Sequence, residues 1–514
     1  MNLSPLGLNA AALPSAVPAR RVPVSSGQLL AACRVCWEEG GQLVALWLSD
    51  ERDRNRGYCL RVVLQDRDGL TMLEHTMPDG DVHYPDLSLV FPAASRMQRA
   101  AFDLVGIPSD SDDQRPWLWL ASWPIDQFPL RRDFVALPKW EPGQEEYAFV
   151  KVAGDGVHEI PVGPVHAGII EPGHFRFQCH GEEIMHLETQ MGYQHRGIEP
   201  MMAGRDLRRS VLLSESVAGD TSIGHSTAFC EVVESLSGCM IPARAQAIRA
   251  VALELERLAN HIGDLGAMGM DAGFLPTSSY CGRMRGDYLN LLLTLSGNRF
   301  GKGLNRPGGV LFDIDDAMAD EFCKKLKVYK KEFDDVSDLL FTRSSVLARF
   351  EDTGVLTTAL AKELGLVGPA SRACQLERDV RINHPSGLWQ YHHIPISLAA
   401  TGDVFARAFV RRQEVVRSLE FLLKVLPSLP KGGVFAQPGP MRPDALAVSM
   451  VEGWRGEIMH VGITDAEGGF RRYKIKDPSF HNWTGLCMAV RGQDISDFPL
   501  CNKSFNLSYC GHDL

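Results

Sequence analysis

No stretch of this sequence is apolar for long enough to cross a lipid bilayer. The two longest candidates, residues 288–295 and 419–426, fall far short of the ~18 apolar residues that a spanning helix needs. The start of the chain also lacks the order of a secretory signal, because its basic pair, Arg20 and Arg21, follows the apolar stretch instead of preceding it. We therefore expect a cytoplasmic protein that does not itself span the membrane.

Positive charge and densely spaced cysteines are also lacking. Lys and Arg number 53 against 63 Asp and Glu, which gives a net charge of −10. Nucleic-acid binding needs a concentrated basic surface, so nucleic acid is excluded as a partner. The 12 cysteines are scattered, as expected for buried thiols in a reducing compartment. Cys33 and Cys36 have the spacing of a metal pair, but no second pair completes four ligands, and we do not expect a metal there.

The pattern of the 514 residues predicts two domains and an α+β fold class. Residues 1–24 are expected to form a disordered tail. Strand-like stretches at 43–47 and 60–64, with a polar turn at 66–69, predict a small α/β domain over residues 25–137. A Pro, Gly and Glu-rich linker at 138–160 follows. Helical periodicity at 245–266, 287–295, 316–346 and 404–426 then predicts a mainly helical second domain over 161–514.

Several motifs in the second domain carry a specific resemblance. They are GPVHAGIIEPGHFRF at 163–177, GYQHRGIE at 192–199, GHSTAFCE at 224–231, ELERLANH at 254–261, PGGV at 307–310 and GDV at 402–404. Residues 161–514 thereby resemble the large subunit of energy-converting [NiFe]-hydrogenases of the formate-hydrogenlyase and hydrogenase-4 type, and more distantly the quinone-site (D) subunit of complex I. Through FDLVGI at 102–107 and PLRRDF at 129–134, residues 25–137 resemble the 30 kDa (C) subunit of complex I.

The hydrogenases of this family hold nickel and iron with four thiolates from two CxxC pairs, a soft ligand set suited to these metals. The resemblance places the first pair at Ala218 and Thr221 and the second at Ser508 and Gly511. None of these residues can donate a thiolate, so we expect no bound metal and no hydrogen turnover. Cys510 lies one position out of register, and an inert thiol is as good an interpretation of it as a specific use.

The resemblance also implies candidate site residues. Asp271 matches the aspartate of the complex I quinone site, Glu199 the acidic start of a proton route, and Arg455 the arginine above the hydrogenase metal. The tyrosine that complex I uses is replaced by Gly219, beside which Asp220 is a hypothetical substitute acid. The other candidates for proton transfer or cofactor binding are His166, Glu171, His174, His225 and Arg283, with Asp379 and Arg381 as a pair near the same cavity.

A structural role competes with each of these assignments, because buried polar side chains usually belong to satisfied hydrogen-bond networks. We favour the structural role for His225 and hold the two roles equal for Asp271 and Glu171.

The function that the resemblance implies is that of a metal-free subunit in a complex-I-like respiratory oxidoreductase, peripheral on the inner face of the cell membrane. Such a complex is NADH-dehydrogenase-like, with NAD binding, quinone reduction and proton translocation among its activities. Its partners would be a small iron–sulfur subunit, which carries the cluster, together with antiporter-like and other membrane subunits. The alternatives are a catalytically silent scaffold of a membrane ion-transport complex and, disfavoured by the missing ligands, an active [NiFe]-hydrogenase.

Overall fold

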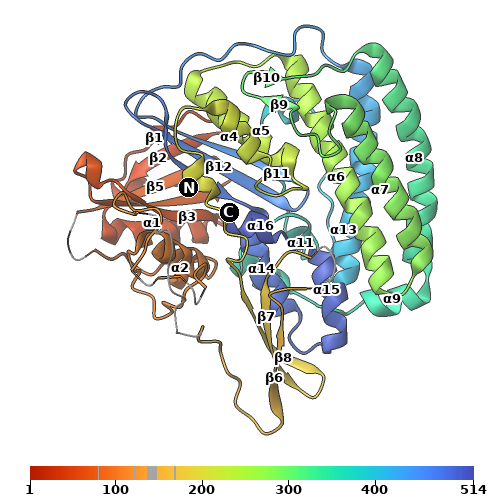
Figure 1. The fold of residues 1–514 in the computed structure, drawn as a ribbon, viewed down its shortest axis with the longest axis horizontal. Coiled ribbons are helices and arrows are strands. Elements are labelled where there is room, and N and C mark those ends of the chain that lie inside the picture. The colour runs from red at the N-terminus through yellow and green to blue at the C-terminus, as the bar shows by residue number, and fades with distance from the viewer. Residues whose placement is uncertain (79, 81, 121–122, 125, 136–146, 167–169) are drawn as a thin grey trace.

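The computed structural model describes residues 1–514 except 79, 81, 121–122, 125, 136–146 and 167–169. Its N-terminal domain is built on a five-stranded sheet in the order β1-β2-β5-β4-β3 (Figure 1). The elements of this domain are β1 (Ala11–Ala12), β2 (Ala19–Pro23), α1 (Ser26–Glu38), β3 (Gln42–Asp50), β4 (Tyr58–Asp66), β5 (Gly69–Met77) and α2 (Ala94–Val105).

The prediction of a disordered tail is wrong for residues 19–23, which form β2. This strand pairs in parallel with β5, from Ala19 opposite Leu70 to Pro23 opposite Glu74. Val22 is fully buried, and Ser25 begins α1 with a capping box that it forms with Gln28. The composition of the tail did not indicate this strand, because the stability of β2 comes from pairing with β5, about 50 residues further along the chain.

Both faces of the N-terminal sheet are buried, which explains why β3 is apolar without alternation. One face packs against α1 and α2, with Leu46 and Leu48 pointing into that core. The other face, with Val44 and Trp47, packs against the central sheet of the second domain. The two domains therefore share a hydrophobic core. Cys33 and Cys36 lie in the first core, where burial raises the pKa of both thiols, that of Cys36 to about 12.

The second domain contains the predicted helices, at the right of Figure 1. Four long helices form its bundle: α6 (Ala243–Asp271), α7 (Leu275–Ser296), α8 (Asp316–Thr342) and α13 (Val404–Val425). Asp315 and Asp403 begin α8 and α13 by accepting hydrogen bonds from the first turn. The shorter helices are α3 (Ile198–Met201), α4 (Leu207–Ser214), α5 (Ser222–Ser237), α9 (Ser344–Phe350), α10 (Thr358–Glu363), α11 (Gly368–Arg372), α12 (Val380–Asn383), α14 (Pro478–Ala489), α15 (Phe498–Phe505) and α16 (Tyr509–Asp513).

Strands in the second domain were largely missed by the sequence patterns. They are β6 (Val157–Val162), β7 (His174–His180), β8 (Glu183–Gln190), β9 (Asn305–Arg306), β10 (Gly309–Val310), β11 (Leu446–Gly453), β12 (Gly456–Thr464) and β13 (Phe470–Lys476). β6-β7-β8 form a sheet that projects at the bottom of Figure 1, and β11-β12-β13 form the central sheet, covered by α5. The predicted linker at 138–160 ends inside β6, and its residues 138–146 lie outside the described part of the chain.

The α+β class predicted from the sequence is confirmed, since helices and sheets occur in both domains. Within the described residues, no helix has the length and hydropathy of a membrane span.

Candidate functional site

The tight turn between β11 and β12 carries Arg455 into the interior. Arg455 and Trp454 are the two residues of this hairpin turn, between Gly453 and Gly456. The backbone of Gly368, at the start of α11, lies so close that a Cβ atom there would approach the carbonyl oxygen of Arg455 to 2.0 Å. Because Gly368 also has a φ of +64°, only glycine fits this contact. The close packing fixes the position of the turn and hence of Arg455.

Arg455 forms a bidentate ion pair with Asp220, just before α5. Nη1 and Nη2 donate to Oδ1 and Oδ2 at 2.6 and 2.7 Å, and the guanidinium lies 3.9 Å from the ring centroid of Trp454. The side chain of Arg455 is 5% exposed. Although burial opposes ionisation of Asp220, Arg455 outweighs it and lowers the pKa of this carboxyl. Asp220 is therefore an ionised counter-charge at neutral pH, which argues against the hypothesis that it acts as a proton donor.

The segments that hold the four expected ligand positions lie next to each other at this ion pair. Arg196 donates to the carbonyl oxygens of Val217 and Cys510, at 2.9 and 3.0 Å, and so joins the two segments. Arg455 links them again through a 2.6 Å hydrogen bond to the carbonyl oxygen of Asn506. Cys510 is buried, and burial raises the pKa of its thiol to about 11.

A buried carboxylate fills the space beside Gly511. A Cβ atom on Gly511 would lie 2.7 Å from Oδ2 of Asp477 and 2.9 Å from Oγ of Ser508. Asp477 cannot turn away freely, because its Oδ1 accepts from the backbone N–H of Ser479 at 2.8 Å and begins α14. Its Oδ2 accepts from Nε2 of His225 at 3.2 Å. This environment has no room for a side chain at position 511.

Asp477 ends a row of four fully buried, hydrogen-bonded side chains. His225 Nδ1 lies 3.0 Å from His460 Nε2, and His460 Nδ1 lies 2.9 Å from the hydroxyl of Tyr473. Burial disfavours ionisation of Asp477, but His225 more than offsets it and lowers the pKa to about 2. Because an ionised Asp477 only accepts, neutral imidazoles in this row are both Nε2–H tautomers, with Tyr473 donating to His460. All donors in the row point towards Asp477.

A second buried network lies behind the turn. Its members are Glu254, Arg257, His261, Arg372, Asp379, Arg381, Glu414 and Glu452. Arg257 donates to the carbonyl oxygens of Glu452 and Gly453, at 2.7 and 3.2 Å. Each of the other charges has an opposite partner, for example Arg372 with Glu414 at 2.8 Å. The predicted pair of Asp379 and Arg381 is present in this network, with 2.6 Å between Oδ2 and Nη2.

Glu199 lies in a separate cluster, on α3 beside β13. It accepts from Lys474 and Arg472, at 2.8 and 2.9 Å, and from the backbone N–H of Ile475. Burial works against its charge, but Lys474 and Arg472 dominate and lower the pKa of Glu199. A carboxylate held in this way is a poor proton shuttle, and its contacts attach α3 to β13.

The predicted residues of the 163–176 loop are divided between two contacts. Glu171 accepts from the backbone N–H groups of Tyr509 and Cys510, both at 3.2 Å, and thereby contacts the segment with the second ligand pair. His166 and His174 instead bond to backbone carbonyls of their own loop, those of Gly173 and Gly163. Burial lowers the pKa of His174.

Asp271 and Arg283 are not brought into contact with the ion pair. Asp271 is exposed at the end of α6. Arg283, 49% exposed on α7, pairs with Asp287 and Glu332 on the surface of the bundle. The structure thus brings together Arg455 and Asp220 at one point, with His225 linked to the same region through Asp477. Sequence reasoning did not find Asp477, His460 or Tyr473, and the Asp-Pro-Ser helix start at 477–479 was the one local signal available.

Comparison with known proteins agrees with this architecture. The family described as "Respiratory-chain NADH dehydrogenase, 30 Kd subunit" matches residues 22–139, and "Respiratory-chain NADH dehydrogenase, 49 Kd subunit" matches residues 271–443. Formate hydrogenlyase subunit 5 of Escherichia coli (strain K12) is 30% identical over 491 residues, which cover 92% of this chain and 85% of that protein. The chain belongs to this family of complex I and hydrogenase subunits. Within the family, hydrogenase-4 component G of the same organism is 30% identical over 92% of this chain and 84% of its own length. An NADH-quinone oxidoreductase subunit of Dehalococcoides mccartyi (strain ATCC BAA-2266 / KCTC 15142 / 195) is 30% identical over 66% of this chain and 93% of its own length.

A nickel–iron centre of this family does not fit the residues present. Ala218, Thr221, Ser508 and Gly511 supply no thiolate, and Asp477 occupies the space that a side chain at 511 would need. Ser508 is already committed, since its hydroxyl accepts from the N–H of Gly511 at 2.9 Å. The described residues also contain no group of three or more His, Cys, Asp or Glu side chains arranged to hold a metal ion.

Proposed function

We propose that this chain is the metal-free large subunit of a membrane-associated, complex-I-like respiratory oxidoreductase. In this proposal the chain is peripheral on the inner face of the cell membrane and packs on a small iron–sulfur subunit and on antiporter-like membrane subunits. Electrons from the partner's cluster reduce a quinone, and the reduction is coupled to proton translocation. The similarity of 92% of the chain to hydrogenase subunits, and of 66% of it to an NADH-quinone oxidoreductase subunit, supports this assignment.

The replacement of the metal site by internal charges carries the proposal. The Arg455–Asp220 pair and the carboxylate of Asp477 stand among the four positions that lack thiolates. Reduction of a quinone to the quinol takes up two electrons and two protons, so protons must be delivered along with the electrons. The row from Tyr473 through His460 and His225 to Asp477 places two imidazoles in one hydrogen-bonded line, and an imidazole can take up a proton on one ring nitrogen and release one from the other.

One observation favours the second candidate, a catalytically silent scaffold. At the ion pair, each of the groups that could meet a substrate is already paired: Arg455 with Asp220 and the backbone of Asn506, and Asp477 with His225. Position 219, where the complex I tyrosine is expected, is a glycine. A chain that only couples its neighbours needs no free donor at this point.

The test uses the complex purified through a tag on this chain. Reduced methyl viologen serves as electron donor and decylubiquinone as acceptor, and nickel content and hydrogen uptake are measured in parallel. We expect viologen-driven quinone reduction without nickel or hydrogen uptake. Stoichiometric nickel would overturn the metal-free assignment. An intact complex that contains an iron–sulfur subunit but reduces no quinone would favour the scaffold.

Two variants then separate the possible proton routes. Asp271→Asn removes the carboxylate that the resemblance assigns to quinone chemistry, and His225→Gln interrupts the buried row. Loss of a positioned proton donor typically lowers turnover by about 10²-fold or more. The matched control is Asp287→Asn, which removes a partly exposed carboxylate from the surface of α7. Unchanged turnover in both test variants, with the complex intact, would refute a proton role for these residues.

A further inference from the structure

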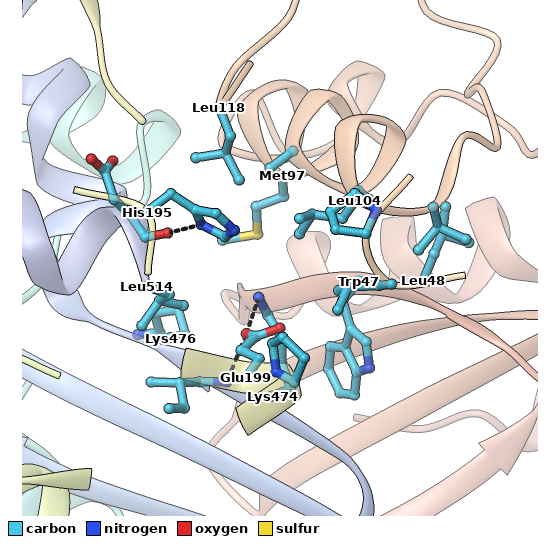
Figure 2. Close-up of a pocket in the computed structure, with 18 of the residues that line it drawn as sticks. Trp47, Leu48, Met97, Leu104, Leu118, His195, Glu199, Lys474, Lys476 and Leu514 are labelled. Carbon is cyan, nitrogen blue, oxygen red and sulfur yellow. Dashed lines mark hydrogen bonds and ion pairs between the residues drawn. The ribbon is translucent and has the colours of Figure 1, made fainter. Parts of the chain in front are cut away.

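A cavity of about 510 Å³ lies between the two domains (Figure 2). Residues of β3 and α2 form one side, and residues of α3, β13, α14 and α16 form the other. Sites for small organic molecules typically enclose about 300–1,000 Å³ and occur preferentially between domains.

The wall contributed by the N-terminal domain is apolar. Trp47, Leu48, Met97, Leu104 and Leu118 surround the space in Figure 2. Trp47, Leu48 and Met97 are all less than 5% exposed, whereas Leu104 and Leu118 are partly exposed, so the wall extends from the protein interior to the surface. Such a surface suits a hydrocarbon or isoprenoid body, whose burial is favourable in proportion to the apolar area removed from water.

The opposite wall is polar but its charges are compensated within the protein. Lys474 and Arg472 share Glu199, at 2.8 and 2.9 Å, and Lys476 pairs with Glu457 at 2.7 Å. The carboxylates of Asp477 and Asp513 also line the cavity, so its three basic side chains face three acidic ones. A charged head group would have to be desolvated without an unpaired opposite charge to meet it, which makes its burial costly. The wall therefore favours a neutral ligand.

Hydrogen-bond donors remain on this wall. The ammonium group of Lys474 has three N–H donors, and Glu199 accepts one of them. His195 points into the space in Figure 2, and its Nδ1–H donates to the carbonyl oxygen of Asp513 at 2.7 Å, so Nε2 of the neutral imidazole is an acceptor. A neutral oxygen acceptor such as a carbonyl matches the remaining donors of Lys474.

We propose that the interdomain cavity binds a neutral amphiphile, with an alkyl or isoprenoid body against β3 and α2 and a carbonyl head at Lys474. Alkyl quinones and fatty-acyl esters share this chemistry. The proposal concerns binding alone and is independent of the proposed electron transfer, so either can fail without the other. Asp477 lines the same cavity, which places the occupant next to the row of buried histidines.

Binding is tested by calorimetric titration of the purified full chain with four probes that share a ten-carbon chain. Decylubiquinone and methyl decanoate have neutral carbonyl heads, whereas decanoate and decyltrimethylammonium are charged. We expect saturable binding of one molecule per chain for at least one neutral probe, at least tenfold tighter than either ion. Preference for decylubiquinone identifies a ring-recognising site, and preference for the ester identifies an acyl site. Equal or tighter binding of an ion, or no saturable binding, overturns the proposal.

Two variants locate the bound probe. Met97→Trp fills the apolar end and Lys474→Met removes the donor, and each should weaken binding at least tenfold. The matched controls, Met240→Trp and Lys331→Met, make the same changes at exposed positions outside the cavity lining and should leave affinity unchanged. Should Met97→Trp fail to fold, methyl 10-bromodecanoate gives a second measurement, because a bromine atom in the cavity quenches Trp47. Quenching that persists unchanged in Trp47→Phe, or wild-type affinity in folded Met97→Trp, contradicts the assignment.

Discussion

A single methyl group at position 511 should test whether the space at this expected ligand position is closed by Asp477. In Gly511→Ala the new Cβ would lie 2.7 Å from Oδ2 and 2.8 Å from Cγ of Asp477. Either the two groups are forced together or Asp477 gives up its bond to His225. Overpacking typically costs ~1–3 kcal/mol, and a hydrogen bond to a charged group is worth about 1.5–3 kcal/mol. Whichever of these two changes costs less free energy will occur, so we expect Gly511→Ala to lower the free energy of unfolding by about 2 kcal/mol.

The measurement is urea unfolding followed by tryptophan fluorescence, in a double-mutant cycle with Asp477→Ser. Serine keeps the hydrogen bond to the N–H of Ser479 that begins α14, but is too short to reach the added methyl. In that background only the 2.9 Å approach to Oγ of Ser508 remains, so Gly511→Ala should cost less than in the wild type, with a coupling of more than about 1 kcal/mol. Gly219→Ala is the control, since a Cβ there meets nothing within 4 Å. Equal costs of Gly511→Ala in the two backgrounds would refute the steric explanation.

Four further predictions concern the charged groups. Asp220→Asn leaves Arg455 without its counter-charge and should lower the free energy of unfolding by about 2–3 kcal/mol. This loss is smaller than the loss on breaking a fully buried ion pair, because Asp220 is 32% exposed. An unchanged urea midpoint would contradict the importance of the pair. Glu414→Gln, inside the closed network, should cost about 3–5 kcal/mol in the same assay. Burial raises the pKa of Glu231 from 4.5 to about 7 although Ser449 and Ser386 donate to it, so stability should fall as the pH rises from 4.5 through 7. Glu231→Gln should remove this fall in stability: relative to the wild type, the variant should gain no free energy of unfolding at about pH 4 and up to about 3 kcal/mol at about pH 8. Parallel profiles of stability against pH for the variant and the wild type would exclude Glu231 as the cause. Arg283→Ala breaks exposed pairs and should change stability by less than about 0.5 kcal/mol, measured by thermal melting.

The long helices were predictable because their apolar residues repeat over many turns. The prediction of 245–266 lies inside α6, and 404–426 coincides with α13 to within one residue. Strands with both faces buried were harder to recognise. The residues of β11 and β12 are buried throughout, so their sequences show neither alternation nor helical periodicity. β2 could not be predicted because it depends on a partner strand far along the chain.

The candidate site was predictable where it depends on residue type alone. The absence of four thiolates follows from the identities of Ala218, Thr221, Ser508 and Gly511. What replaces them depends on contacts between segments that are far apart in the chain, such as Arg455 with Asp220 and Asp477 with His225. No spacing rule reports such contacts. Asp271 and Arg283 are the opposite case: they were predicted from their resemblance to functional residues, but in the structure neither contacts the Arg455–Asp220 pair.

The Arg455–Asp220 pair explains how a charged side chain can be buried among the expected ligand positions. A guanidinium that is 5% exposed cannot remain without an opposite charge, because the desolvation of an unpaired ion is too costly. Asp220 supplies that charge from the segment that carries two of the expected ligand positions. At the second segment, Asp477 fills the space at Gly511 while it accepts a hydrogen bond from His225. Because Asp477 also lines the interdomain cavity, this region and the proposed ligand site share one carboxylate. A ligand that binds in the cavity would therefore act on the buried histidines through Asp477.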